Sequence, residues 1–182
     1  MLSAGFASVK INTVLLKGFN ACEVLDFANL ARIKPLHVRF IEYMPTDTCE
    51  FPYSDLFSSA VDAKDIVSSL GKLVPVQGED AGVANVYTIK NFRGTIGFIA
   101  PMSAPFCGAC NKLRLTSDGR LRSCLHSSEA VDVKKAIREG AGEEEIALLI
   151  KKTVAMKPRA HHLAERPLGH GSESFSMCQI GG

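Results

Sequence analysis

A strand–helix–strand pattern near the start of the chain constrains its fold more than any other feature. Residues 9–16 and 36–43 are rich in β-branched and aliphatic side chains and predict two buried strands. Between them, Asn20 and Glu23 have the spacing of a capping box ahead of a helix. At helical spacing, this helix would bury four apolar residues: Val24, Phe27, Ala28 and Ala31. Two strands joined by a helix pair in parallel, and such a sheet needs further strands to be covered.

The later part of the chain predicts smaller elements. Residues 65–70 predict a helix that ends near Gly71. Residues 72–77, 84–90 and 94–100 predict an antiparallel meander, and residues 117–120 predict a turn between strands at 112–116 and 121–124. Two helices follow, one over 130–139 and one from Glu143, whose expected apolar face is Ile146, Leu149, Ile150 and Val154. The expected class is therefore α/β, followed by an α+β part with a small antiparallel sheet.

Composition and charge exclude several classes of protein. Hydrophobic residues make up 46% and charged residues 22%, as in ordinary globular proteins. The formal net charge of +2 is too small to predict bulk nucleic-acid binding. The sequence has no apolar run long enough to span a bilayer, and residues 1–10 do not have the pattern of a secretory signal. A cytoplasmic protein is expected, with neither a nucleic acid nor a membrane as partner.

Three of the six cysteines stand close together as Cys107-x2-Cys110-x13-Cys124. In a reducing compartment such a cluster indicates a metal site more often than disulfides. Three thiolates leave one coordination position open. A structural zinc ion would take a fourth ligand, for which His126 is the candidate. A 4Fe–4S cluster held by three cysteines would instead leave one iron free to bind a small molecule, and the spacing alone does not decide between the two.

Two cations directly follow the second cysteine. Lys112 and Arg114 are two residues apart on a predicted strand, so both project from one face. Cations beside a metal cluster form an anion site suited to phosphate. The neighbouring cysteines favour this interpretation over an ordinary solvated strand face.

Five motifs, in order along nearly the whole chain, give it a family resemblance. The chain resembles the GTP 3′,8-cyclase (MoaA) family of radical S-adenosylmethionine (SAM) lyases, which act first in molybdenum cofactor biosynthesis. The motifs are residues 9–12 (VKIN), 38–44 (VRFIEYM), 106–115 (FCGACNKLRL), 118–125 (DGRLRSCL) and the terminal Gly181-Gly182.

The resemblance implies a fold and a chemistry. It implies the last βα units of an incomplete (β/α) barrel over residues 1–71, and a C-terminal iron–sulfur and GTP-binding domain over residues 72–182. The family carries two 4Fe–4S clusters, and the N-terminal cluster cleaves SAM. The resulting radical abstracts a hydrogen from the ribose of GTP, whose purine is bound at the open iron of the C-terminal cluster. The sugar carbon then attacks C8 of guanine, and the product is 3′,8-cyclo-GTP.

The resemblance also implies roles for individual residues. Cys107, Cys110 and Cys124 would hold the C-terminal cluster. Lys10, Lys112, Leu113 and Arg114 would contact GTP, although the family commonly has arginine where Lys112 stands. Arg39 and Met44 would line the SAM pocket, and Gly181 and Gly182 would enter the active site as a catalytic tail.

One departure from the family pattern is large. The Cys-x3-Cys-x2-Cys signature that holds the SAM-cleaving cluster does not occur in this sequence. The lone chain is therefore expected to be a C-terminal portion that cannot cleave SAM. SAM and the second cluster are expected only with an N-terminal half. Candidate partners are GTP, a separately encoded N-terminal barrel half, and a second copy of the chain.

Overall fold

The computed structural model describes residues 2–44, 52–76, 83–127 and 129–160. The chain divides into two compact units, with a boundary between Phe106 and Cys107. Each unit is described on its own below. The predicted division into residues 1–71 and 72–182 stays a prediction.

The first unit is built on a five-stranded mixed sheet. Its strands are β1 (Val9–Leu15), β2 (Leu36–Glu42), β3 (Val74–Pro75), β4 (Asn85–Thr88) and β5 (Thr95–Ile99), in the order β1-β2-β5-β4-β3. β1 pairs in parallel with β2, as predicted, and β2 pairs in parallel with β5. The remaining pairs, β5 with β4 and β4 with β3, are antiparallel.

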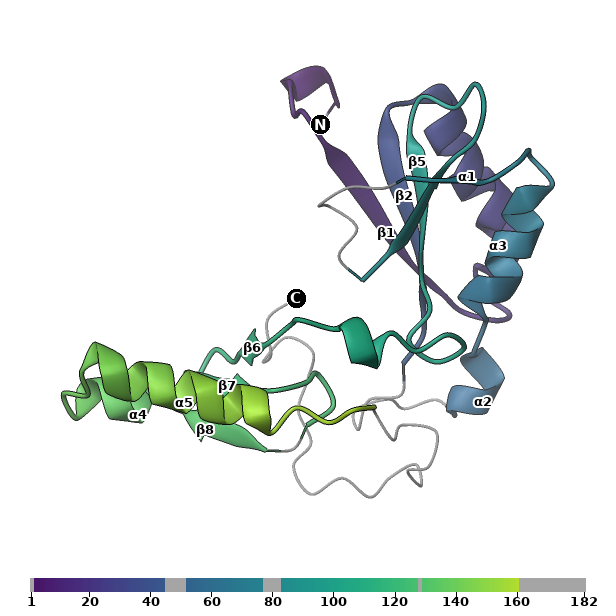
Figure 1. The fold of residues 1–182 in the computed structure, drawn as a ribbon. Helices are drawn as coiled ribbons and strands as arrows, with labels where there is room; N and C mark the ends of the chain where they lie inside the picture. The colour runs from purple at the N-terminus through teal and green to yellow at the C-terminus, as the bar shows by residue number, and fades with distance from the viewer. Residues whose placement is uncertain (1, 45–51, 77–82, 128, 161–182) are drawn as a thin grey trace. The chain divides into compact units, whose positions relative to one another are not determined.

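Helices cover one face of this sheet. They are α1 (Val24–Ile33) and α3 (Ala60–Ser68). The unit also contains the short helix α2 (Tyr53–Leu56) and the 3-10 turns η1 (Leu2–Ala4) and η2 (Ala21–Glu23). Figure 1 shows α1 and α3 side by side along the sheet. The core lies between these layers, where the Phe40 and Phe98 rings stack at 5.8 Å. The buried residues of the two strands and two helices include Val38, Phe40, Ile96, Phe98, Val24, Ala28, Ala31, Ala60, Ala63 and Val67.

One local prediction for this unit was wrong, and two others were confirmed with added detail. Asn20 makes no capping bond; its side chain accepts a hydrogen bond from the Leu16 amide and donates one to the Val14 carbonyl, so it closes the turn after β1. The helix predicted over residues 65–70 is confirmed in part: α3 ends at Ser68 and begins at Ala60, where the Ser59 hydroxyl caps it. The predicted antiparallel meander is confirmed as β3, β4 and β5, and it continues the parallel part of the sheet because β5 also pairs with β2.

The second unit contains a three-stranded antiparallel sheet and two helices. Its elements are η4 (Cys107–Ala109), β6 (Arg114–Leu115), β7 (Arg120–Arg122), β8 (Ala130–Asp132), α4 (Val133–Arg138) and α5 (Glu143–Ala155). The sheet order is β6-β7-β8, which confirms the predicted β6–β7 hairpin. Figure 1 shows α4 and α5 lying along this small sheet.

Two details of the second unit differ from the predictions. Residues 130–132 were predicted as helix but form β8, and α4 starts at Val133 because the Asp132 side chain accepts a hydrogen bond from the Lys135 amide. The predicted apolar face of α5 is confirmed only in part: Ile146 and Leu149 are half-buried beside the buried Thr153, whereas Ile150 and Val154 are exposed. Along the described ranges, no helix is both long and apolar enough to cross a bilayer.

Candidate functional site

The predicted Lys10 and Arg39 lie on the sheet face opposite α1 and α3. Lys10 pairs in register with His37, and Asn12 pairs with Arg39. Register partners on neighbouring strands project to the same side, so all four polar side chains share one face. The alternating residues of β1 and β2 face the core instead. Lys10 and Arg39 were predicted as site residues from the sequence, whereas His37 has no signal there.

Two features of β5 shape this polar face. Gly97 pairs with Arg39, and a Cβ atom at Gly97 would lie 3.1 Å from the Arg39 side chain. Glycine therefore leaves the room in which the arginine side chain lies. The Thr95 hydroxyl is 2.7 Å from Nδ1 of His37 and fixes that ring.

Glu42 is the one acidic residue among the five strands, and it belongs to the buried side of β2. The polar face is consequently basic, which suits an anionic ligand.

Glu42 joins three segments where β2 ends. Its side chain is 1% exposed. One carboxylate oxygen accepts hydrogen bonds from the Ala60 amide at 3.0 Å and from the Ser103 hydroxyl. The other oxygen accepts from the amides of Met102 at 2.8 Å and Ser103 at 3.0 Å. The carboxylate therefore ties the end of β2 to the start of α3 and to the turn that follows β5.

The predicted SAM-pocket residue Met44 comes directly after this junction. β2 ends at Glu42, so Met44 lies beyond the strand that carries Arg39. An aromatic cluster adjoins this segment, in which the rings of Tyr43 and Tyr53 stack at 6.1 Å. Burial, and to a smaller extent the charge on Glu42, raise the pKa of Tyr53 to about 12. Tyr53 is therefore a neutral hydrogen-bonding group at physiological pH.

The three cysteines all lie in the second unit and are half-buried. Cys107 opens the single turn η4, whose backbone closes with a 3.1 Å hydrogen bond from the Cys110 amide to the Cys107 carbonyl. The β6–β7 ladder then reverses the chain and pairs Arg114 with Arg122. Cys110 precedes this pair by four residues and Cys124 follows it by two. The hairpin thus returns Cys124 toward the strand that leaves Cys110.

Cations gather on the same hairpin. The strand predicted over residues 112–116 was too long: β6 spans only Arg114–Leu115, so Lys112 precedes it and the two cations do not share a strand face. Lys112 is exposed, whereas Leu113 and Arg114 are half-buried. Arg122 is 5% exposed and pairs directly with Arg114. Two cationic side chains therefore lie opposite one another on the strands of this hairpin. The sequence analysis missed Arg122, although its place beside Cys124 was a usable signal.

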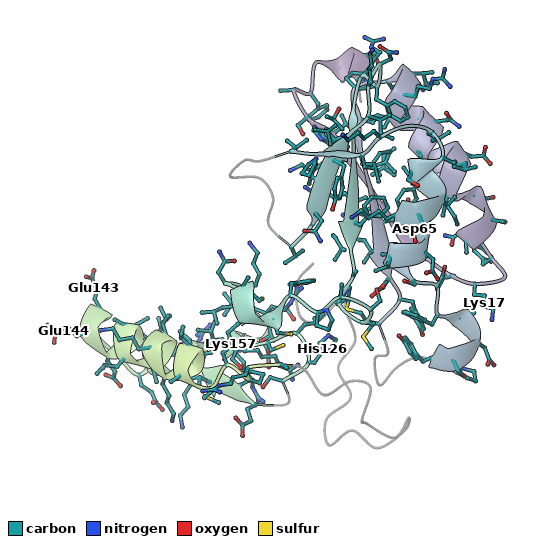
Figure 2. All side chains as sticks on the ribbon, turned by 45° about the vertical axis from the view of Figure 1, so that its right-hand side comes forward. Lys17, Asp65, His126, Glu143, Glu144 and Lys157 are labelled. Carbon is teal, nitrogen blue, oxygen red and sulfur yellow. The ribbon has the colours of Figure 1, made fainter. Side chains whose placement is uncertain are left out.

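A lysine distant in the sequence also reaches the hairpin. Nζ of Lys157 donates hydrogen bonds to the Lys112 carbonyl at 2.7 Å and to the Ser123 carbonyl at 3.0 Å. Figure 2 shows Lys157 between the C-terminal end of α5 and the small sheet, and His126 on the loop that follows β7. No local sequence pattern predicts a contact between Lys157 and residues 34 and 45 positions earlier.

The donor set can be tested against the metal centres that the sequence suggested. Within the described residues, no three His, Cys, Asp or Glu side chains are grouped closely enough to hold one metal ion. A zinc site built from the cysteines and His126 would need such a grouping, with each sulfur about 2.3 Å from the ion. In a 4Fe–4S cluster each thiolate binds a different iron, so its ligands are spread more widely. Three half-buried thiols on one turn and one hairpin supply the sulfur donors that either kind of centre would use. Gly181 and Gly182 lie outside the described residues.

Comparison with known proteins adds the following. A curated relative from Pelotomaculum thermopropionicum, named GTP 3′,8-cyclase, is 44% identical over 183 residues, which cover 100% of this chain and 55% of the relative. Relatives of the same name from Moorella thermoacetica and Syntrophomonas wolfei are 40% and 42% identical, over 100% and 96% of this chain and 55% and 53% of their own lengths. The chain spans about half the length of the curated relatives it matches.

The family named Molybdenum Cofactor Synthesis C matches residues 36–163. This segment includes β2 with Arg39, the three cysteines with their cationic hairpin, and Lys157. Because the match covers more than half of the sequence, the chain belongs to the Molybdenum Cofactor Synthesis C family.

Proposed function

We propose that this chain is the GTP-holding portion of a GTP 3′,8-cyclase in molybdenum cofactor biosynthesis. The observation that carries the proposal is the cysteine hairpin. Cys107 and Cys110 lie on the turn before β6, Cys124 follows β7 by two residues, and these paired strands carry the cations Arg114 and Arg122. The relatives named GTP 3′,8-cyclase are similar to this chain over its whole length or nearly so. We assign a 4Fe–4S cluster to the three cysteines.

The proposed roles divide between the two units. When bound, the cluster offers one iron with an open position for a purine. Lys112 and Arg114 would neutralise GTP phosphates, and Leu113 would pack against the nucleotide. In the first unit, the basic face would supply Lys10 to the GTP phosphates. Arg39 and Met44 would line the SAM pocket, and Gly181 and Gly182 would complete the active site.

The SAM-cleaving step is assigned to residues outside this chain. β1 ends the described sheet, and its second edge is paired with none of the described strands. Parallel sheets are normally continued or covered, so this edge is consistent with further barrel strands. Since the relatives are nearly twice as long as this chain, we propose that the remaining length carries the second cluster and SAM, in the same or a separate polypeptide. Without it the chain would bind GTP but not cyclise it.

The cluster is tested by anaerobic reconstitution of the full chain with iron and sulfide. Wild type should bind about four irons and four sulfides and absorb broadly in the visible region. Cys124→Ser should lower iron binding, whereas Cys22→Ser, at an exposed free cysteine in the other unit, should not. A colourless protein with one equivalent of zinc would overturn the cluster assignment.

GTP binding is tested separately by calorimetry on the reconstituted chain. Arg114→Ala should weaken binding about tenfold or more, because charge-assisted bonds to phosphate are among the strong ones. Arg138→Ala is the matched control, since Arg138 is an exposed arginine at the end of α4. Equal affinity in Arg114→Ala and wild type would refute the phosphate role.

A further inference from the structure

Lys157 joins the two strands of the cysteine hairpin where their ladder ends. The last register pair of β6 and β7 on this side is Arg114–Arg122. The two carbonyls bound by Lys157 belong to Lys112 and Ser123, which lie just beyond that pair. One nitrogen atom therefore holds both strands together where the ladder no longer does.

The two contacted residues flank the proposed cluster ligands. Lys112 follows Cys110 by two residues, and Ser123 directly precedes Cys124. A carbonyl held in place fixes the peptide plane next to it, and so fixes the direction from which the neighbouring side chain leaves the backbone. An ammonium group has three donors, so it can bind both carbonyls and keep one donor for another acceptor.

Lys157 is itself anchored on the far side. Its backbone amide donates to the Val154 carbonyl at 3.0 Å, and the Met156 amide donates to the Lys152 carbonyl at 3.1 Å, so both residues extend the last turn of α5. The hydroxyl of Ser123, a residue 1% exposed, donates in turn to the Met156 carbonyl at 3.4 Å. The end of α5 and the strand before Cys124 are therefore tied together in both directions.

We propose that Lys157 is a positioning residue for the three-cysteine centre, setting the separation between the strand after Cys110 and the strand before Cys124. The inference rests on the proposed function for its consequence at the cluster. We call the two hydrogen bonds from Lys157 to the carbonyls of Lys112 and Ser123 the clasp. The clasp forms in the protein without the cluster. Removing the ammonium group should let the two strands separate at the end of the hairpin. Cys124 should then bind its iron less tightly.

The first test measures amide hydrogen exchange in the full chain without iron. Lys157→Met keeps the length of the side chain and removes its donors. Exchange in residues 111–115 and 121–125 should accelerate about tenfold, because bonds from a charged donor are stronger than neutral ones. Exchange in α5 should not change. Lys157→Arg should restore protection, and Lys151→Met is the control, since Lys151 is exposed on α5. Unchanged exchange at the hairpin in Lys157→Met would overturn the inference, as would equal acceleration throughout the second unit.

The second test compares the reconstituted proteins by iron content and by electron paramagnetic resonance after reduction. Lys157→Met should bind less iron and give an altered signal, and Lys157→Arg should return toward wild type. If wild type binds no cluster, the proposed function fails, while the exchange experiment still decides whether Lys157 is a clasp. If wild type binds a cluster and Lys157→Met matches it in iron content and signal, the positioning role is refuted and the proposed function stands.

Discussion

Replacing Glu42 by glutamine tests how much of the first unit depends on one buried carboxylate. The two oxygens of Glu42 accept four hydrogen bonds from Ala60, Met102 and Ser103. Glutamine has nearly the same shape but only one acceptor oxygen. Its best orientation keeps that oxygen on the amides of Met102 and Ser103, and turns its NH2 group toward the Ser103 hydroxyl, which can accept. The Ala60 amide then faces a donor.

The expected loss of stability follows from these contacts. A buried amide left without an acceptor costs about 1–3 kcal/mol. Each of the three remaining bonds loses charge assistance, and relief from burying a charge offsets part of that loss. Together these effects should lower the free energy of unfolding by about 2–4 kcal/mol. A typical domain is stable by only roughly 5–15 kcal/mol, so this is a large share.

The assay is urea unfolding followed by circular dichroism, since the chain contains no tryptophan. Ser103→Ala removes only the hydroxyl contact and should cost about 1 kcal/mol. Glu139→Gln is the matched control: this glutamate is 65% exposed and pairs weakly with Lys135 at 3.8 Å, so its loss should stay within about 0.5 kcal/mol. A Glu42→Gln protein as stable as the control would refute the reasoning.

Three further predictions concern packing and pH. A Cβ at Gly94 would lie 2.7 Å from the Leu36 nitrogen, so Gly94→Ala should lower stability by about 2 kcal/mol or more in urea unfolding, whereas Gly108→Ala, with open space, should not. The raised pKa of Tyr53 means that the unfolded chain, with its ordinary value of 10.0, loses the phenol proton first. Stability should therefore fall as pH rises from about 10 to 12, and Tyr53→Phe should flatten that fall in thermal melts. The hydrogen bond from the Thr116 hydroxyl lowers the pKa of Asp118 below its ordinary value of 3.8. The stability that the ionised carboxylate gives the folded state should therefore be lost as pH falls through that lowered pKa. Asp118→Asn should lose less stability in acid than wild type does.

Much of the fold could be predicted because its signals are local. The parallel pairing of β1 and β2 follows from the helix between them, and the β6–β7 hairpin follows from the turn residues. The place of β5 could not be predicted in this way. It pairs in parallel with β2 across more than fifty residues, and nothing in the sequence of residues 94–100 distinguishes this from a purely antiparallel meander.

Errors arose where one local pattern competed with another contact. Asn20 has the spacing of a helix cap, but its side chain satisfies two backbone groups of the preceding turn instead. α5 has an apolar stripe at helical spacing, yet the helix packs through the face that carries the buried Thr153. For Asn20 the deciding partners lie only four and six residues earlier in the chain, whereas for α5 they belong to α4, β7 and β8.

The candidate site likewise contains residues that the sequence predicts and residues that only the folded structure reveals. Cysteine spacing and the neighbouring cations were visible in the sequence, because each lies within one hairpin. His37, Glu42 and Lys157 were missed because their roles depend on partners in other elements. A buried carboxylate or a clasping lysine has no signature until the chain has folded around it.

The central position of β5 also has a consequence for how the chain acquires its structure. β1, α1 and β2 form a contiguous unit early in the sequence, but β2 lacks its second neighbour until residue 99 has been made. Closing so long a loop is entropically costly and slows folding, whereas the contacts of β6, β7 and β8 are short in range. During synthesis the second edge of β2 therefore has no strand to pair with while more than fifty residues are made. This nascent segment is the part of the chain on which we expect a chaperone to act.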